Sequence, residues 1–294
     1  MKKSFQKKLI AAAMFCLSFL FFNSLESHAN NDIRLIIRGD DMGMTQGSIA
    51  AFQRAFNQGV LTCASIQVTA PWFEAAAALS KGNPNWCLGV HLAIIGEWRG
   101  YRWRPVLPWD NVSSIVDKDG FLYRHPEELL SNKPDINEIE AEFRAQIELA
   151  LKKGVNVQYL DTHYLGYNSY PGLRNVFIKI ARAFDLPISG MMGETRMSGV
   201  YRIDEDKKTE IAVKQLKRLK PGLWLWVAHL GIDSPEQNAL IHTHPDHAVP
   251  GGGVGKHRAA ELKAITSKEV KSIISEKGIE LITYRDLWKD RTKP

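Results

Sequence analysis

Cysteine is scarce in this sequence, with three residues among 294. Cys16 lies in an amino-terminal apolar segment, so only Cys63 and Cys87 belong to the expected folded part. Two isolated cysteines do not make a zinc site on their own, because such sites use four clustered ligands. Each begins a predicted strand, so the two side chains could face each other across neighbouring strands. An oxidising compartment would favour a disulfide between them, and the alternative is two buried thiols that pack as small apolar residues.

The sequence has only a small excess of charge of one sign, and it shows no repeat or low-complexity tract. The formal charge is +6, and the first 29 residues carry half of it, since they hold four lysines against Glu26. The remaining +3 forms no basic stripe with interleaved aromatic residues, which argues against a nucleic-acid partner. Removing 29 of the 294 residues leaves 265, enough to bury a large core. Residues 30–294 are therefore expected to form a single domain.

The one long apolar run lies at the amino terminus. It extends from Leu9 to Phe22, about 14 residues, whereas a membrane span needs roughly 20. Small residues follow it in Ser27-His28-Ala29, and four lysines precede it: Lys2, Lys3, Lys7 and Lys8. The pattern predicts a signal peptide over residues 1–29, cleaved near Ala29, and an exported protein, periplasmic or secreted. No stable membrane insertion is expected after cleavage; the alternative is an uncleaved anchor.

Four apolar stretches end on Asp or His. They are residues 35–41, 87–92, 157–163 and 223–229. Each is typical of a buried parallel strand, and the carboxyl ends of parallel strands share one face, where ligands bind. Helix-length segments separate the four, so we expect one polar site assembled from the whole chain. Such a site indicates a metal-dependent hydrolase rather than a binding module.

The alternation of strands and helices predicts an α/β fold. Helical periodicity covers residues 45–58, 71–81, 135–153, 173–184, 209–219 and 266–276, and further strands are expected at 61–69, 186–191 and 279–284. This pattern favours a TIM-like (β/α) barrel, distorted and closed or nearly closed, with about seven strands. Two segments break the rhythm, an irregular stretch over 96–126 that is expected to be functional and a polar loop over 231–257.

Asp40 and Asp41 are the first candidates for chemistry. Adjacent side chains on a strand point to opposite faces, so both can face one ligand only if the strand has ended, and Gly43 permits such a turn. One carboxylate could then bind a metal while the other acts as general base on a metal-bound water. In the alternative, Asp41 caps the helix that begins near Thr45, or both carboxylates are merely solvated.

Three histidines follow apolar strands. Together with Asp41, His91 and His163 match a set of two histidines and one carboxylate that leaves positions open for water and substrate. Asp161 points the same way along its strand as His163 and could accept the second ring hydrogen of that histidine. His229 could be a further ligand or a general acid. Each histidine alone would more simply be a core residue.

The irregular segments offer substrate contacts. Aromatic residues between 98 and 109, Trp98 among them, could stack on sugar rings or anchor the loop in the barrel mouth. A second group of histidines lies in the polar loop and suggests either a flexible substrate rim or a separate metal site: His242, His244, His247 and His257.

The motifs at these positions resemble those of the YdjC-like family, which includes chito-oligosaccharide deacetylases and is related to the NodB-type polysaccharide deacetylases. Residues 35–43 are similar to the opening family motif with its paired Asp, Gly89-Val90-His91-Leu92 to Gly-Leu-His-Leu, and Asp161-Thr162-His163 to Asp-Ser-His. Residues 104–108 and 114–120 resemble the family's insertion, and 258–262 with 279–287 its carboxyl-terminal pattern. The likeness covers most of the chain in order.

This resemblance implies a barrel with one divalent metal held by Asp41, His91 and His163. It implies that Asp40 is the base and that His229 takes the place of the family's late histidine, which protonates the leaving amine. The chain departs from the family pattern at Tyr164-Leu165-Gly166 and at Leu230. The departures concern the substrate pocket and the acid rather than the metal ligands.

The resulting prediction is an exported, metal-dependent hydrolase that removes acetyl groups from N-acetylated carbohydrates. Its partner is an acetylated mono- or oligosaccharide, its cofactor Mg²⁺ or Zn²⁺, and its predicted substrate-binding residues are Trp98, Arg104 and Arg258. An O-acetyl-carbohydrate esterase and a non-catalytic carbohydrate-binding relative are the alternatives. The sequence leaves open whether the protein forms a homodimer.

Overall fold

The structure is a computed structural model that describes residues 32–244 and 248–290. The predicted signal peptide lies outside the described residues. The chain divides into a unit of residues 1–32 and a unit of residues 33–294, and the fold given below is that of the second unit. Every helix in the described ranges is too short or too polar to cross a bilayer.

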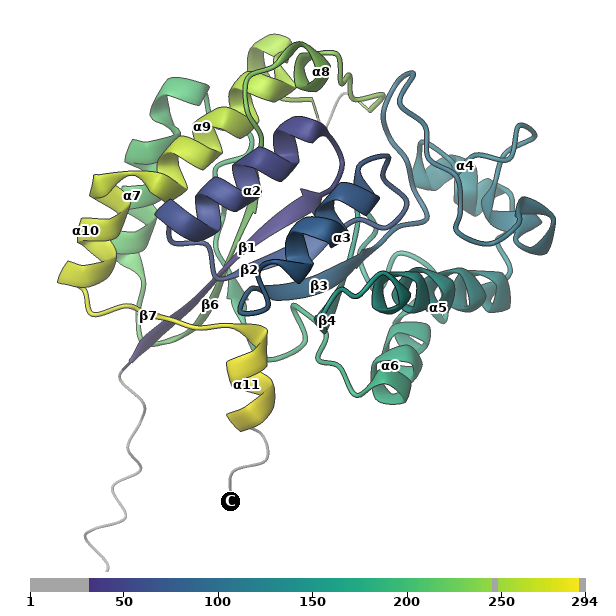
Figure 1. Cartoon of the computed structure of the whole chain (residues 1–294), viewed down its shortest axis with the longest axis horizontal. Coiled ribbons are helices and arrows are strands. Elements are labelled where there is room, and N and C mark those ends of the chain that lie inside the picture. Colours follow the sequence, from purple (N-terminus) through teal and green to yellow (C-terminus); the bar gives the residue numbers. More distant parts are fainter. Residues whose placement is uncertain (1–31, 245–247, 291–294) are drawn as a thin grey trace, which may run out of the picture. The chain divides into compact units, whose positions relative to one another are not determined.

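Seven parallel strands form one sheet in this unit (Figure 1). They are β1 (Ile33–Met42), β2 (Cys63–Ile66), β3 (Cys87–Leu92), β4 (Val157–Thr162), β5 (Thr195–Arg196), β6 (Gly222–His229) and β7 (Glu280–Leu281). Their order is β4-β3-β2-β1-β6-β5, and β7 pairs with the start of β1. The sheet curls into a half-barrel, which confirms the prediction of a distorted (β/α) barrel. It stays open, because no pairing among the described residues joins β4 to β5.

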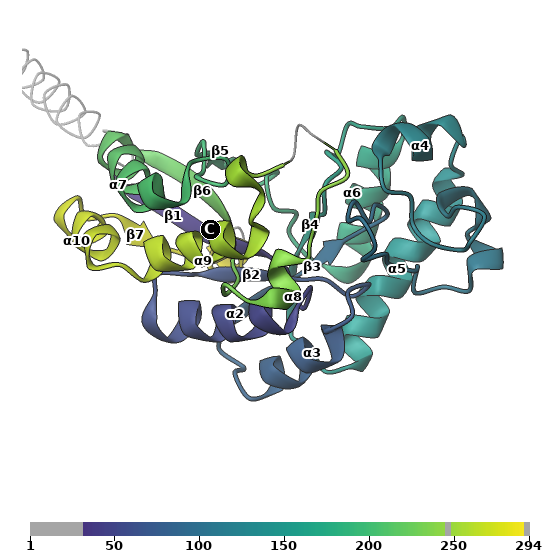
Figure 2. The ribbon, with the colours of Figure 1, turned by 90° about the horizontal axis from the view of Figure 1, so that it is seen from above.

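Helices surround the outside of the curved sheet (Figure 2). They are α2 (Gln46–Gln58), α3 (Phe73–Lys81), α4 (Pro126–Ser131), α5 (Ile136–Lys152), α6 (Leu173–Phe184), α7 (Lys208–Arg218), α8 (Pro235–Asn238), α9 (Val254–Thr266), α10 (Lys268–Glu276) and α11 (Tyr284–Asp290). Several begin close to their predicted starts because capping residues mark those starts. Thr45 accepts a hydrogen bond from the backbone N–H of Ser48 at the start of α2, and Asp135 accepts one from Asn137 at the start of α5.

Helix α9 is the main element that the sequence did not predict, since its first turn falls in the expected polar loop. The helix buries charged and polar residues together with apolar ones, including His257, Arg258 and Glu261. Polar residues that face inward remove the amphipathic period by which helices are recognised. Three predicted strands are also shorter than expected: 61–69 contributes only β2, 186–191 contributes one bridge, Leu160 to Ile188, and 279–284 contributes only β7.

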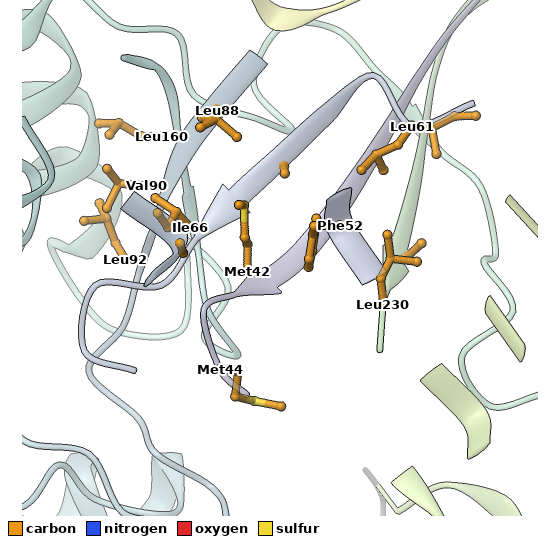
Figure 3. Packing of buried hydrophobic residues seen from close by; sticks show 14 of the residues in the cluster. Met42, Met44, Phe52, Leu61, Ile66, Leu88, Val90, Leu92, Leu160 and Leu230 are labelled. Carbon is orange, nitrogen blue, oxygen red and sulfur yellow. The ribbon is translucent and has the colours of Figure 1, made fainter. Parts of the chain in front are cut away.

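Alternate residues of each strand point to opposite faces, which gives the unit two cores. The outer core lies beneath the helices and contains Leu88, Val90 and Leu92 of β3, which Figure 3 shows on one side of that strand. The inner core fills the hollow of the sheet with residues such as Ile36 and Tyr159. Helix α11 contributes to this inner core through Tyr284 and Leu287, which supports the floor of the half-barrel.

Cys63 and Cys87 belong to the inner core. They are register partners on β2 and β3, so the prediction that they face each other across neighbouring strands is confirmed. Both are buried free thiols.

Hydrogen bonds to α5 and to the loop near residue 242 help to anchor the segment 96–126 to the unit. The buried carboxylate of Glu142 on α5 accepts hydrogen bonds from the backbone N–H groups of Val106 and Leu107, at 2.8 and 3.0 Å. Near the start of the segment, Glu97 O accepts from the backbone N–H of Thr243, and Arg99 N–H donates to Ile241 O. The two loops predicted to be irregular therefore hold each other beside the carboxyl ends of the strands.

Candidate metal centre and active site

The pair Asp40-Asp41 lies in a bulge rather than after the end of a strand. Strand β1 continues to Met42, but its register with β2 shifts between Gly39 and Met42. The backbone of Asp41 has φ +67°, a left-handed conformation that costs energy for a residue other than glycine but that Asp tolerates better than most. This bulge turns both carboxylates toward one site. The alternative role of Asp41 as a helix cap is excluded, since Thr45 caps α2.

Asp41, His91 and His163 meet at the mouth of the half-barrel. Oδ1 of Asp41 lies 3.3 Å from Nε2 of His91 and 3.3 Å from Nδ1 of His163, and the two ring nitrogens are 3.2 Å apart. Tetrahedral ligands at about 2.0–2.1 Å from a zinc ion stand about 3.3 Å from one another. All three side chains are buried, so the donors converge as the prediction requires.

Each of these side chains uses its other polar atom to bind an outer partner. Nε2 of His163 contacts Oε2 of Glu97 at 2.8 Å, and Nδ1 of His91 lies 3.0 Å from Oδ1 of Asp161, though not in line for a straight hydrogen bond. Oδ2 of Asp41 accepts a hydrogen bond from Arg258 at 2.7 Å. Such outer contacts fix the orientation and tautomer of metal ligands.

The raised pKa values of His91 and His163 reflect an excess of negative charge in the site. Burial by itself lowers the pKa of His91, but Asp161 and Asp40 outweigh it and raise that pKa to about 10. Burial acts in the same way on His163, and the charge of Glu97 outweighs it, with Asp41, to raise the pKa to about 9. Without a metal, the carboxylates thus attract protons onto both rings. A divalent cation would satisfy the same charge.

The residues present fit a divalent metal. Oδ1 of Asp41 is buried and has no hydrogen-bond partner, although an isolated buried carboxylate oxygen is costly. Two imidazoles and one carboxylate suit zinc and other first-row ions. The atoms that make no outer contact, Oδ1 of Asp41, Nε2 of His91 and Nδ1 of His163, face one another, as the ligands of a metal centre do.

Asp40 and His229 stand next to each other beside this centre. They are register partners on β1 and β6, so their side chains share the interior face of the sheet. Both oxygens of Asp40 accept hydrogen bonds from Arg38. The ring of His229 packs against Tyr201, with ring centroids 4.6 Å apart, and its Nδ1 is buried without a hydrogen-bond partner. Burial lowers the pKa of His229 to about 4, so the ring is neutral near pH 7.

Several predicted contacts differ in the structure. Asp161 orients His91 rather than His163, because Asp161 and His91 are register partners on β4 and β3. Arg258 is only 1 % exposed and is engaged with Asp41, so it supports the centre and is not open to a sugar.

The other two predicted sugar contacts belong to the 96–126 segment. Trp98 has no exposed surface and lies between Arg258 and His242, as expected for a residue that anchors the loop. Arg104 is exposed, but its guanidinium donates to Gly120 O and stacks on Phe121 within the same segment.

The second histidine group is dispersed. His257 lies on α9 and contacts the backbone of Pro250, while Nε2 of His242 contacts the hydroxyl of Tyr201 at 2.8 Å. His247 lies outside the described residues. In the described parts of the chain, the groups of metal-ligating side chains that converge all belong to the centre at Asp41 and its neighbour Asp40.

Sequence reasoning missed Glu97 and Arg38. Glu97 is 2 % exposed and follows His91 by six positions, within a segment that looks like an aromatic loop. Arg38 is the one charged residue inside the apolar run Leu35–Gly39. A charge within a buried strand needs a partner, and that signal could have pointed to Asp40 and Asp161.

Together, the fold and the site define a (β/α) half-barrel with one candidate metal centre at its mouth. Residues 34–276 match the model of the YdjC-like protein family. The chain therefore belongs to the YdjC-like family, as its motifs predicted.

Similar proteins match nearly the whole length of the unit formed by residues 33–294. A carbohydrate deacetylase of Brevibacillus brevis is 26% identical over 272 residues, which cover 87% of this chain and 100% of that protein. One of Enterococcus faecalis is 27% identical over 262 residues, 86% of this chain and 98% of that protein. The crystal structure of an Enterococcus faecalis protein named for cellobiose-phosphate cleavage has a TM-score of 0.71 at 23% identity, covering 87% of this chain and 99% of that one. It shares the fold.

Proposed function

We propose that this protein is a metal-dependent carbohydrate deacetylase that removes acetyl groups from N-acetylated sugars. The observation that carries the proposal is the convergence of Asp41, His91 and His163 directly beside Asp40 and His229. Similarity to proteins named carbohydrate deacetylase supports the choice of substrate class. One divalent ion, Zn²⁺ or Mg²⁺, is the proposed cofactor, with Asp41, His91 and His163 as its ligands.

The metal, when bound, supplies Lewis acidity that polarises the acetyl carbonyl and lowers the pKa of water. Asp40 is the proposed general base: its carboxylate takes a proton from the attacking water as oxygen bonds to the acetyl carbon. Arg38 holds both carboxylate oxygens, so the base keeps one orientation. The addition gives a tetrahedral oxyanion on the substrate, and donors around it stabilise the developing charge.

His229 is the proposed acid for the leaving amine. Since burial lowers its pKa to about 4, the ring starts neutral, and the proton that Asp40 has accepted must reach it before the C–N bond breaks. The adjacent positions of Asp40 and His229 on β1 and β6 favour this transfer. Breaking that bond with protonation of nitrogen releases acetate and a free amino sugar.

Tyr201 is the proposed wall of the sugar site in place of Trp98. Its ring is half-buried against His229, and His242 fixes its hydroxyl. A flat ring with an anchored hydroxyl offers both a stacking face and a polar contact to a sugar. We also propose export, on the strength of the signal-like segment over residues 1–29.

Acetate release by metal-stripped protein tests this function. The protein is resupplied with single ions and offered matched N-acetylated and O-acetylated oligosaccharides. Metal-dependent release from the N-acetylated set is expected. Release from the O-acetylated set alone would select the esterase, and tight sugar binding without any release would select a non-catalytic binding protein.

A further inference from the structure

The guanidinium of Arg38 joins three segments inside the curled sheet. Nε and Nη2 donate to the two oxygens of Asp40, each at 2.7 Å. Nη1 donates to Oγ of Ser189 at 2.5 Å and lies 3.1 Å from Oδ2 of Asp161. Every nitrogen of the group therefore has an oxygen partner. The side chain is buried, with 7 % of the residue exposed.

This arrangement restricts the orientation of Asp40. A two-point contact between a guanidinium and a carboxylate fixes the plane of both groups, which a lysine ammonium, as a point charge, does not do. The cost of burying Arg38 is offset only because both Asp40 and Asp161 balance its charge. Removing the guanidinium would leave two buried carboxylates facing each other.

Arg38 also reaches across the hollow of the half-barrel to the segment beside β4. Ser189 belongs to the segment that follows the bridge between Leu160 and Ile188, beyond the last strand on the β4 side. Tyr167 donates to the backbone carbonyl of Ser189, and the hydroxyl of Tyr284 contacts its side chain. A side chain of the central strand β1 thus contacts the segment that the Leu160–Ile188 bridge joins to the β4 edge of the sheet.

We propose that Arg38 is a positioning residue that holds Asp40 as the general base and Asp161 as the partner of His91 in one arrangement. This inference rests on the proposed function, because Asp40 needs a fixed orientation only if it acts on a water molecule. A merely structural Arg38 would affect folding and leave turnover per folded site unchanged.

Arg38→Lys tests the inference, with Arg34→Lys on the same strand as the matched control. We expect kcat to fall by about 100-fold while KM stays within about threefold, because misplacing a reacting group by about 1 Å costs this much. Metal content and the fraction of folded protein are measured in the same samples. A kcat for Arg38→Lys equal to that of Arg34→Lys at normal metal content would overturn the inference.

A double-mutant cycle with Asp40→Asn shows whether Arg38 acts through Asp40. If it does, adding Arg38→Lys to Asp40→Asn should lower kcat by less than about threefold further, since the group being positioned is already lost. A full additional loss of about 100-fold in the double variant would contradict the inference.

A double-mutant cycle on the free energy of unfolding separates this inference from the proposed function. The unfolding equilibrium constants of Arg38→Met, Asp40→Asn and the double variant should show a coupling of at least about tenfold, as contacting charged residues do. If the wild type releases no acetate, the proposed function fails on its own, and strong coupling still supports the contact. Additive effects on unfolding, with an active wild type, would refute the positioning role alone.

Discussion

Arg258 donates a hydrogen bond from Nη2 to Oδ2 of Asp41 at 2.7 Å, across 217 positions of sequence. The contact joins α9, near the end of the chain, to the bulge of β1 at its beginning. Burial tends to raise the pKa of Asp41, but Arg258, together with His163 and His91, holds it well below its usual range. The carboxylate therefore stays ionised, and its second oxygen remains directed at the two histidines.

Replacing Arg258 by Met should weaken metal binding by about 10- to 100-fold, as loss of an outer contact to a ligand does. The KM for the sugar should change little, because Arg258 is covered by Trp98 and does not reach the solvent. Calorimetric titration of the metal checks this. Arg104→Met is the matched control and should bind metal normally. A large rise in KM at normal metal affinity would restore Arg258 as a sugar contact.

Replacing His91 or His163 by Ala should remove the metal and the activity together, since each supplies one of three converging donors. Metal per protein is measured by elemental analysis beside acetate release. His125→Ala, a half-buried histidine at the start of α4, should retain both. A fully active, metal-loaded variant at either position would refute the assigned centre.

Replacing Glu97 by Gln should lower metal affinity by about tenfold or more, because the anionic partner of His163 is lost. At saturating metal, kcat should recover to within a few-fold of the wild type. Steady-state assays over a range of metal concentrations distinguish the two effects. The exposed Glu127→Gln serves as control, and an unchanged metal dependence in the Glu97 variant would show that Glu97 has no such role.

The stability of the protein should change with pH because of Glu261. Burial raises the pKa of Glu261 to about 7, against the opposing effect of Lys208. Between the ordinary value near 4.5 and about 7, the unfolded chain has lost this proton and the folded chain retains it, so this group's contribution to stability falls as pH rises through that window. Relative to the wild type, Glu261→Gln should gain about 2 kcal/mol between pH 5 and pH 8. Chemical denaturation at both pH values measures the gain, and a pH-independent difference would contradict it.

Gly89 should not tolerate a side chain. An added Cβ would lie 2.4 Å from the ring of Tyr159, which packs in the inner core beneath Asp161. Gly89→Ala should destabilise the protein by about 1–3 kcal/mol, the usual cost of overpacking. Gly82→Ala, where the nearest atom is 3.5 Å away, is the control and should change the midpoint little. Equal thermal midpoints for the two variants would contradict this packing.

Local patterns in the sequence determined much of the fold and the ligand set. The apolar strands, the caps at Thr45 and Asp135, and the polar ends of four strands all depend on residues close together in the chain. Parallel strands must bring their carboxyl ends to one edge, so the meeting of Asp41, His91 and His163 followed once the strands were recognised.

Tertiary structure alone decided which partner each of these residues has. Register placed Asp161 beside His91, the bulge at Asp41 turned a second carboxylate into the site, and packing of α9 buried Arg258 where an open sugar contact had been expected. Register, bulges and the burial of charge depend on contacts between distant segments. A local hydrophobic pattern carries the period of an element, but it does not record which neighbour the element meets.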